Sequence, residues 1–230
     1  MGLLTLVRHG QASFFGANYD ELSPAGHAQA RALGEHWVRH GVAFDAVYVG
    51  PRRRHRQTLD SVAAVYAAHG RALPAAREVG ELDEHDGLTV IRHALGAGGP
   101  RAPAQDPGEA GRELLLREFM RHYHQIMRDW ARGTLVVPDV EPWPDFRART
   151  LRALDLMCAA PGDAVAFTSG GFVSSAAGWL LGLDEDRVIE LSAVLKNTAL
   201  TEVRHSGRRR GLTSFNTLPH LPDPRAATTI

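Results

Sequence analysis

The stretch Leu3-Leu4-Thr5-Leu6-Val7-Arg8-His9-Gly10-Gln11 decides the expected fold. Its first five residues are apolar or β-branched, and Arg8, His9 and Gly10 follow them directly. A short, continuous apolar run that is closed by glycine is typical of a buried central strand in a parallel sheet. Ligands bind beyond the carboxyl ends of such strands, where Arg8 and His9 stand. The stretch therefore predicts a site at the end of the first strand.

Arg8 and His9 supply two chemical groups that suit phosphate. A guanidinium is a planar fork of donors that matches phosphate oxygens. A neutral imidazole nitrogen is available near pH 7 and can act as a nucleophile. Gly10 lets the backbone turn sharply where a side chain would obstruct a ligand. Taken alone, the triplet leaves a strand end with an incidental histidine as an equal alternative.

Composition places the chain among globular proteins with balanced charge. It has 230 residues, 44% of them hydrophobic, which suits one large domain or one domain with an insert. Lys plus Arg and Asp plus Glu both number 26, which argues against a general nucleic-acid binder. The single cysteine, Cys158, excludes an internal disulfide and a cysteine metal cluster, and it suits a reducing compartment. We expect no signal peptide, no membrane span and a cytoplasmic location.

Strand and helix patterns alternate along the chain. Strands are expected at 3–8, 44–49, 77–82, 164–168, 188–191 and 199–204, and helices at 24–40, 57–69, 112–132, 144–160 and 172–182. Residues 96–111 read as a flexible loop and residues 215–230 as a polar, Pro-rich tail. The alternation predicts a single three-layer α/β/α domain over residues 1–230, with a central mostly parallel sheet and a helical insert at about 88–160.

A second basic cluster follows the strand expected at 44–49. The turn Pro51-Arg52-Arg53-Arg54-His55-Arg56-Gln57-Thr58 carries four arginines within five residues, at a strand end and a helix start. Helix N-termini add backbone donors and a partial positive charge, so the turn suits an anion. For this stretch taken alone, a solvated basic turn or an RNA-contacting patch is the alternative.

These segments together resemble the histidine phosphatase superfamily, which includes the cofactor-dependent phosphoglycerate mutases. The resemblance runs through most of the chain and lies in the order and spacing of Arg8-His9-Gly10, Leu22-Ser23-Pro24-Ala25-Gly26 with Gln29-Ala30, Pro51-x-x-Arg54-x-x-Gln57-Thr58, Leu82-Asp83-Glu84 followed by Gly87, Glu141 with Asp145-Phe146-x-x-Arg149, Val165 to Gly171, and Asn197 to Glu202. No single segment is specific.

The resemblance implies a role for each of four residues. His9 is the nucleophile that accepts the phosphoryl group, and Arg8 and Arg54 hold the phosphoryl oxygens. Fixed guanidinium groups suit the negative charge of a phosphoryl group in transfer. Glu84 is the acid that protonates the leaving alcohol, because it fits the Leu-x-Glu pattern better than the neighbouring carboxylates do.

Other basic groups near these residues are given lesser roles. The arginines expected to be solvated surface charges are Arg52, Arg53 and Arg56. We expect His55 and His85 to lie on the surface or behind the residues that touch a substrate.

The sequence departs from the family pattern at the late strand. The family usually has a second histidine directly before the Gly-Gly pair, whereas this chain reads Thr168-Ser169-Gly170-Gly171. The Ser169 hydroxyl and the Gly170 backbone could touch phosphate oxygens, but serine supplies no imidazolium charge. His220 is the candidate that would fill the space of the missing histidine. The combination of Arg-His-Gly-Gln-Ala-Ser with Thr-Ser-Gly-Gly resembles one branch of the family.

We therefore expect a phosphomonoester hydrolase that works through a phosphohistidine, without a metal or other cofactor. The expected substrate is a small phosphorylated metabolite or a phosphoprotein, with neither nucleic acid nor membrane as a partner. Two alternatives stay open: phosphoglycerate mutase-like phosphoryl transfer, and a catalytically weak pseudo-enzyme that binds a phospho-ligand. The sequence leaves the oligomeric state open, with a dimer as one option.

Overall fold

A computed structural model describes residues 1–13, 20–96, 111, 122–159, 162–207 and 209–229. Its strands are β1 (Gly2–Arg8), β2 (Ala46–Val49), β3 (Ala76–Glu78), β4 (Ala164–Thr168), β5 (Leu200–Ser206) and β6 (Arg209–Thr217). Its α-helices are α1 (Pro24–Arg39), α2 (Arg53–Ala68), α3 (Gly87–Leu95), α5 (Trp143–Ala159), α6 (Gly170–Leu181) and α7 (Glu185–Val194), and residues 122–131 are also helical. Two short 3₁₀ turns are η1 (Gly80–Leu82) and η3 (Pro224–Ala226).

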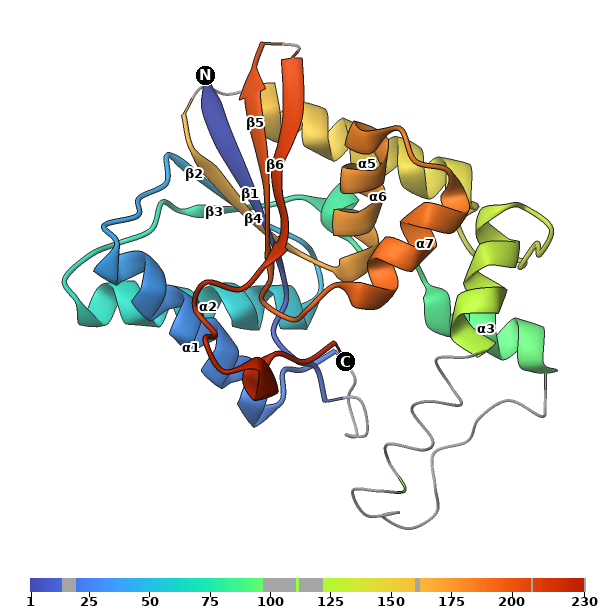
Figure 1. Ribbon diagram of the computed structural model, residues 1–230, viewed down its shortest axis with the longest axis horizontal. Helices are drawn as coiled ribbons and strands as arrows, with labels where there is room; N and C mark the ends of the chain where they lie inside the picture. Colours follow the sequence, from blue (N-terminus) through green and yellow to red (C-terminus); the bar gives the residue numbers. More distant parts are fainter. Residues whose placement is uncertain (14–19, 97–110, 112–121, 160–161, 208, 230) are drawn as a thin grey trace.

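One six-stranded sheet lies at the centre of the fold, in the order β3-β2-β4-β1-β5-β6 (Figure 1). β1 to β4 run parallel to one another, whereas β5 runs antiparallel to both of its neighbours. Arg8 pairs with Thr168 in the ladder between β1 and β4, so the carboxyl ends of these two central strands meet. The predicted α/β class with a mostly parallel sheet is confirmed.

Helices cover both faces of the sheet (Figure 1). Side chains alternate between the faces along a strand, and β1 follows this rule although both of its faces are buried. Leu4 and Leu6 pack in one cluster with residues of α5 and α6, and Val7 packs in another with residues of α1 and α2. A third cluster joins α3, residues 122–131, the start of α5 and α7. This packing fixes the strand ends from which the site is built.

The start of α1 follows the capping pattern that the sequence predicts. Ser23 is the N-cap residue, and its hydroxyl accepts a hydrogen bond from the backbone N–H of Gly26 at 3.1 Å. Pro24 takes the first helical position, where its missing N–H costs nothing. The helix therefore begins directly after the loop that leaves β1.

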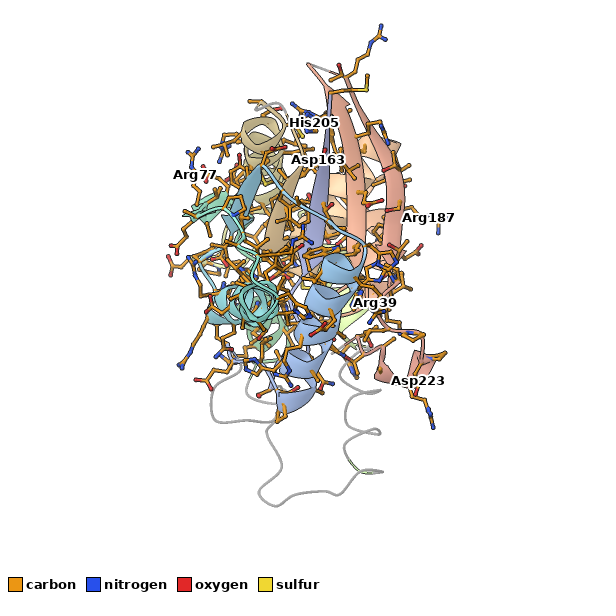
Figure 2. All side chains as sticks on the ribbon, turned by 90° about the vertical axis from the view of Figure 1, so that its left-hand side faces the viewer. Arg39, Arg77, Asp163, Arg187, His205 and Asp223 are labelled. Atoms are coloured by element: carbon orange, nitrogen blue, oxygen red, sulfur yellow. The ribbon has the colours of Figure 1, made fainter. Side chains whose placement is uncertain are left out.

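The two ends of the central strands carry different groups of residues. Figure 2 shows Asp163 and His205 together at one end of the sheet, where β4 begins and β5 ends. The Asp163 carboxylate accepts a hydrogen bond from the backbone N–H of Leu3 at 2.9 Å, which fixes the start of β1. The opposite end, at the carboxyl ends of β1 to β4, carries the predicted site residues.

Three predicted segments differ from the structure. The strand expected at 188–191 is wrong, because these residues lie inside α7, where Asp184 caps the helix by accepting from the Arg187 N–H at 2.9 Å. The strand expected at 77–82 is shorter, and η1 replaces its second half. The tail expected at 215–230 begins inside β6, a strand that the sequence reading did not predict.

The loop predicted at 96–111 and the helix predicted at 112–132 fall largely outside the described residues. Residues 122–131 are helical, as predicted. None of the helices in the described part of the chain combines the length and the apolar character needed to span a bilayer.

Candidate active site

Four predicted site residues follow the carboxyl ends of four parallel strands. His9 follows β1, Ser169 follows β4, Arg54 lies in the first turn of α2 after β2, and Glu84 comes shortly after β3 and η1. The backbone N–H of His9 donates to the carbonyl of Thr168 at 2.9 Å, which ties the first two strand ends together. The parallel order of the sheet thus brings residues far apart in sequence to one edge.

The His9 ring is buried and held in one orientation. Its Nδ1 lies 2.7 Å from the carbonyl oxygen of Gly10, so Nδ1 carries the hydrogen and the lone pair stands on Nε2. Nε2 has no hydrogen-bond partner among the residues that the structure describes. Burial first, then the positive charges of Arg54 and Arg8, hold the His9 pKa well below its usual value. The ring is therefore neutral at pH 7, as a nucleophile requires.

The backbone around His9 is fixed from three sides. A Cβ atom at position 10 would meet the Gly26 carbonyl at 2.5 Å, so only glycine fits there. The Gly10 N–H donates to the Thr58 hydroxyl at 3.1 Å, and the Asn197 amide donates to the His9 carbonyl at 3.2 Å. These contacts hold the nucleophile without using its side chain.

Arg54 is almost fully buried, and its guanidinium contacts Asp20 and Ser169. Nη1 donates to a carboxylate oxygen of Asp20 at 2.9 Å, and Nη2 donates to the Ser169 hydroxyl oxygen at 3.4 Å. The carbonyl of Arg54 accepts from the Thr58 hydroxyl, which also bonds to Gly10. The structure thus brings Arg54, Ser169 and the segment after β1 together.

Arg8 lies beside the start of α6. A Cβ atom at Gly170 would stand 3.4 Å from Arg8 Nε, which places the guanidinium next to the expected phosphate donor Gly170. Nη2 of Arg8 donates to the carbonyl of Thr229 at 2.7 Å, and Nη1 donates to the carbonyl of Leu195. These two contacts fix the position of the Arg8 guanidinium.

The segment that reaches Arg8 is anchored on α1 and on the loop before β5. The Gln29 amide donates to the carbonyl of Ala226 and to the hydroxyl of Thr228, both at 2.9 Å. The backbone N–H of Asn197 donates to the Thr228 carbonyl at 2.8 Å. In Figure 1 this segment accordingly crosses α1 near its N-terminal end. It forms one wall around Arg8.

The Glu84 side chain also reaches the start of α6. Its carboxylate accepts from the backbone N–H of Gly171 at 3.1 Å and from that of His85 at 3.1 Å. Burial would raise the pKa of the carboxyl group, but the nearby His85, the Gly171 N–H and the positive charge of Arg54 outweigh it and lower the pKa. Glu84 is thus a carboxylate when no ligand is present.

Two residues behind Glu84 hold its loop. His85 is buried, and its Nε2 lies 3.5 Å from Glu84 Oε1. Arg149 of α5 donates to the carbonyls of Glu81 and Asp83 at 2.9 and 2.7 Å, and it pairs with Glu141 at 2.9 Å. The helix α5 therefore fixes the backbone that carries the acid.

Ser169 is contacted by His55 rather than by His220. Nε2 of His55 lies 2.6 Å from the Ser169 hydroxyl oxygen, and the His55 and His9 ring centroids are 5.8 Å apart. His220 instead bonds through Nε2 to the Thr198 hydroxyl at 2.9 Å. Burial and the nearby His36 lower the pKa of His220 to about 4. The imidazole beside Ser169 thus comes from α2.

The remaining arginines of the basic turn pair with carboxylates. Arg52 is half-buried against Asp83, Arg53 is exposed and pairs with Glu21, and Arg56 is partly exposed and pairs with Glu78. The prediction of surface charges holds for Arg53 and Arg56. Arg52 is more deeply placed, because it bridges the start of α2 to the loop of Glu84.

Of the two places that the sequence left open for His55, the structure shows the one behind a site residue. His55 is completely buried and lies directly behind Ser169, as His85 lies behind Glu84. Residues 55, 58, 59 and 62 are all buried on one face of α2, at the spacing of a buried helical stripe. That spacing was the signal that could have placed His55 inside.

One protein family matches the sequence over most of its length. A sequence model of the histidine phosphatase superfamily (branch 1) matches residues 4–114 and 109–218. No curated protein matches the sequence closely enough to count as a relative. Within the described part of the chain, no three His, Cys, Asp or Glu side chains are grouped to hold a metal ion.

Solved structures share the fold at low sequence identity. YhfR of Bacillus stearothermophilus is 17% identical, with a TM-score of 0.67 over 96% of this chain and 100% of that one. A mycobacterial glucosyl-3-phosphoglycerate phosphatase is 20% identical, with a TM-score of 0.60 over 94% and 99% of the two chains. An α-ribazole phosphatase from Shigella flexneri is 19% identical, with a TM-score of 0.61 over 94% and 96%. With its sequence matched over most of its length, the chain belongs to the histidine phosphatase superfamily, branch 1.

Proposed function

We propose that the protein is a phosphomonoester hydrolase in which His9 carries the phosphoryl group between two half-reactions. The observation that carries the proposal is the orientation of His9, whose Nδ1 is tied to the Gly10 carbonyl while Nε2 keeps its lone pair. The charge of Arg54 acts on this ring, and Glu84 stands at the start of α6. A nucleophile, a cation and a carboxyl group are what a phosphohistidine mechanism needs.

In the first half-reaction, the lone pair of His9 Nε2 attacks phosphorus. A P–N bond forms, the ester P–O bond breaks, and the leaving oxygen takes a proton from Glu84. The guanidinium groups of Arg8 and Arg54 stabilise the charge on the phosphoryl oxygens, together with the Ser169 hydroxyl and the backbone N–H groups at the start of α6.

The proton on Glu84 arrives with the substrate. A phosphate monoester has a second pKa of about 6, so a sizeable share enters as the monoanion near neutral pH. Its negative charge beside Glu84 also raises the pKa of that carboxyl group and offsets the effect of Arg54. The carboxyl group then holds the proton until the ester bond breaks.

In the second half-reaction, water attacks the phosphorus of phosphohistidine. Glu84, now a carboxylate, accepts a proton from this water, the P–N bond breaks, and its electron pair returns to His9. Inorganic phosphate leaves with the proton that Glu84 took from water, which restores the carboxylate, and the net reaction consumes one ester and one water. We propose a small phosphorylated metabolite or a phosphoprotein as the substrate.

The test is hydrolysis of p-nitrophenyl phosphate without added metal, with rapid acid-free trapping of the phosphorylated protein. We expect turnover, and a phosphoryl group that is labile in acid and stable in base, as a phosphoramidate is. The variant His9→Ala should lose both. An acid-stable phosphoserine, or unchanged turnover by His9→Ala, would overturn the assignment of the nucleophile.

The same assay separates hydrolysis from the two alternatives. A mutase would pass the phosphoryl group to a second hydroxyl and release little phosphate, whereas a phospho-ligand binder would bind inorganic phosphate without turnover. The names of the mycobacterial and Shigella neighbours are those of phosphatases, which supports hydrolysis.

A further inference from the structure

The hydroxyl group of Ser169 does not cap the helix that begins after it, although a serine at this position usually does. Ser169 is the N-cap residue of α6, and such a serine ordinarily accepts a hydrogen bond from the first turn of its helix. Here the side chain makes no capping bond. Its oxygen instead lies 2.6 Å from His55 Nε2 and 3.4 Å from Arg54 Nη2. The hydroxyl is therefore turned away from its own helix.

The Ser169 hydroxyl can form only a limited set of hydrogen bonds. A serine hydroxyl has one hydrogen to donate and two lone pairs to accept with, and a guanidinium only donates. Arg54 thus occupies one lone pair of Ser169 Oγ. Whether the other lone pair is occupied depends on which nitrogen of His55 carries the hydrogen.

The surroundings of His55 place that hydrogen on Nε2. Burial, then the charges of Arg54 and Arg52, hold the His55 pKa well below its usual value against the opposing effect of the Gly50 backbone, so the ring is neutral and carries one hydrogen. Nδ1 lies against the Gly50 backbone but makes no well-aligned hydrogen bond there, whereas Nε2 lies 2.6 Å from Ser169 Oγ. A hydrogen on Nδ1 would be poorly satisfied, and a poorly satisfied buried N–H is less favourable than a bare acceptor nitrogen. The hydrogen on Nε2, by contrast, has Ser169 Oγ as its acceptor.

We propose that His55 and Arg54 together orient the Ser169 hydroxyl so that it donates its hydrogen to a phosphoryl oxygen bound beside His9. With both lone pairs occupied, the hydroxyl can act only as a donor, and it has no acceptor among the described residues. The inference rests on the proposed function, because it assigns a ligand to the same site.

His55 is a positioning residue in this arrangement. It is completely buried, so it reaches a ligand only through Ser169. The arrangement explains how a site with serine before the Gly-Gly pair still directs a donor at phosphate. It also explains why an imidazole occupies position 55 in a face of α2 that is otherwise packed with Thr58, Leu59 and Val62.

The first test is a double-mutant cycle on the affinity for inorganic phosphate, measured by calorimetry. A hydrogen bond to a charged group corresponds to a loss of roughly tenfold to a hundredfold when it is removed. We expect such a loss in Ser169→Ala and in His55→Leu, and no further loss in the double variant. Losses that multiply in the double variant, or unchanged affinity in either single variant, would overturn the proposal.

The control uses a second His–Ser pair outside the site. Nδ1 of His27 lies 3.0 Å from the Ser61 hydroxyl, between α1 and α2. The variant His27→Leu removes a bond of the same type, and its phosphate affinity should equal that of the wild type. If it falls as far as that of His55→Leu, the loss reflects helix packing and the proposal fails.

The second test needs no substitution at the buried position 55. The ¹⁵N chemical shifts of the His55 ring, measured with and without inorganic phosphate, report which nitrogen carries the hydrogen. We expect a hydrogen on Nε2 in the phosphate-bound protein. A hydrogen on Nδ1 would mean that Ser169 donates to His55 and has nothing to offer a ligand, which would overturn the proposal.

These outcomes are separable from those of the proposed function. If the phosphate affinities of the Ser169 and His55 variants follow the expected double-mutant cycle but the protein does not hydrolyse p-nitrophenyl phosphate, only the hydrolase proposal fails. A protein that hydrolyses the ester equally well with Ser169→Ala would remove this inference alone.

Discussion

The carboxylate of Glu84 sits where a side chain on Gly171 would have to be. It accepts the Gly171 N–H at 3.1 Å, and a Cβ atom built at position 171 would overlap both the carboxylate and the ring of His85. The second glycine of the Gly-Gly pair is therefore required by the acid that faces it. Its backbone conformation is one that other residues adopt as well.

The variant Gly171→Ala should accordingly disable the acid while leaving the fold intact. The carboxylate is the end of a flexible side chain and can swing away, whereas the buried His85 ring has to shift, so we expect a modest fall in the free energy of unfolding. Turnover of alkyl phosphates should fall roughly tenfold to a thousandfold, within the range of general acid catalysis. Gly211→Ala on β6 is the control, because a Cβ atom there meets nothing within 4 Å. Equal losses in both variants would contradict this account.

Glu84→Gln should discriminate between leaving groups. The amide keeps the size of the side chain but has no proton to give, so esters of alkyl alcohols should slow by roughly 10²–10⁴. Esters of p-nitrophenol should slow far less, because nitrophenolate leaves without protonation. The ratio of kcat/KM for the two substrates measures the effect. Glu78→Gln, at an exposed ion pair with Arg56, is the control, and a uniform loss in Glu84→Gln would show that it is not the acid.

The lowered pKa of His9 sets the acid limb of activity. A histidine with its ordinary pKa near 6.5 would lose roughly tenfold of its neutral form between pH 7.5 and pH 5.5. Because burial and two arginines hold the pKa of His9 well below that value, the ring keeps its neutral form to a lower pH than an ordinary histidine does. We expect kcat/KM for p-nitrophenyl phosphate to fall by much less than tenfold as the pH is lowered from 7.5 to 5.5. A tenfold decline with a midpoint near 6.5 would contradict the assignment.

His220 should make the fold sensitive to acid. Its pKa is about 4 in the folded protein, against 6.5 for an exposed histidine, so the unfolded chain binds a proton more readily between these values. Stability is then complete above pH 6.5 and is lost as the pH falls toward 4. Between pH 7 and pH 4.5, we expect the free energy of unfolding of His220→Gln to fall by roughly 2 kcal/mol less than that of the wild type. Urea unfolding at both pH values measures the difference, and parallel losses would refute it.

The elements that the sequence predicted well are those with two independent signals. β1 combines an apolar run with a closing glycine, and α1 combines an amphipathic face with the Ser23-Pro24 start. The strand expected at 188–191 rested on a short apolar run alone. The Asp184 cap and the acidic first turn of α7 were the competing signal, and they prevailed because this apolar face packs into the third core cluster.

The partners of the site residues were harder to predict than the residues themselves. Motif order could suggest His9, Arg54 and Glu84 because each follows a strand, and parallel strand ends share an edge. It could not show that His55 and not His220 faces Ser169, because that depends on the rotation of α2 about its axis. A helix rotation is set by packing of the whole buried stripe, which no short motif records.

Arg8 and Thr229 touch although 221 positions separate them. The same short segment is held by Gln29 and Asn197, and no strand or long helix reinforces it. Segments with few buried apolar contacts open locally at a lower free energy than the core does. On heating, this end of the chain should detach from Arg8 before the sheet melts. Loss of activity would then precede loss of secondary structure, and the protein would pass through a folded but inactive state that recovers fully on cooling.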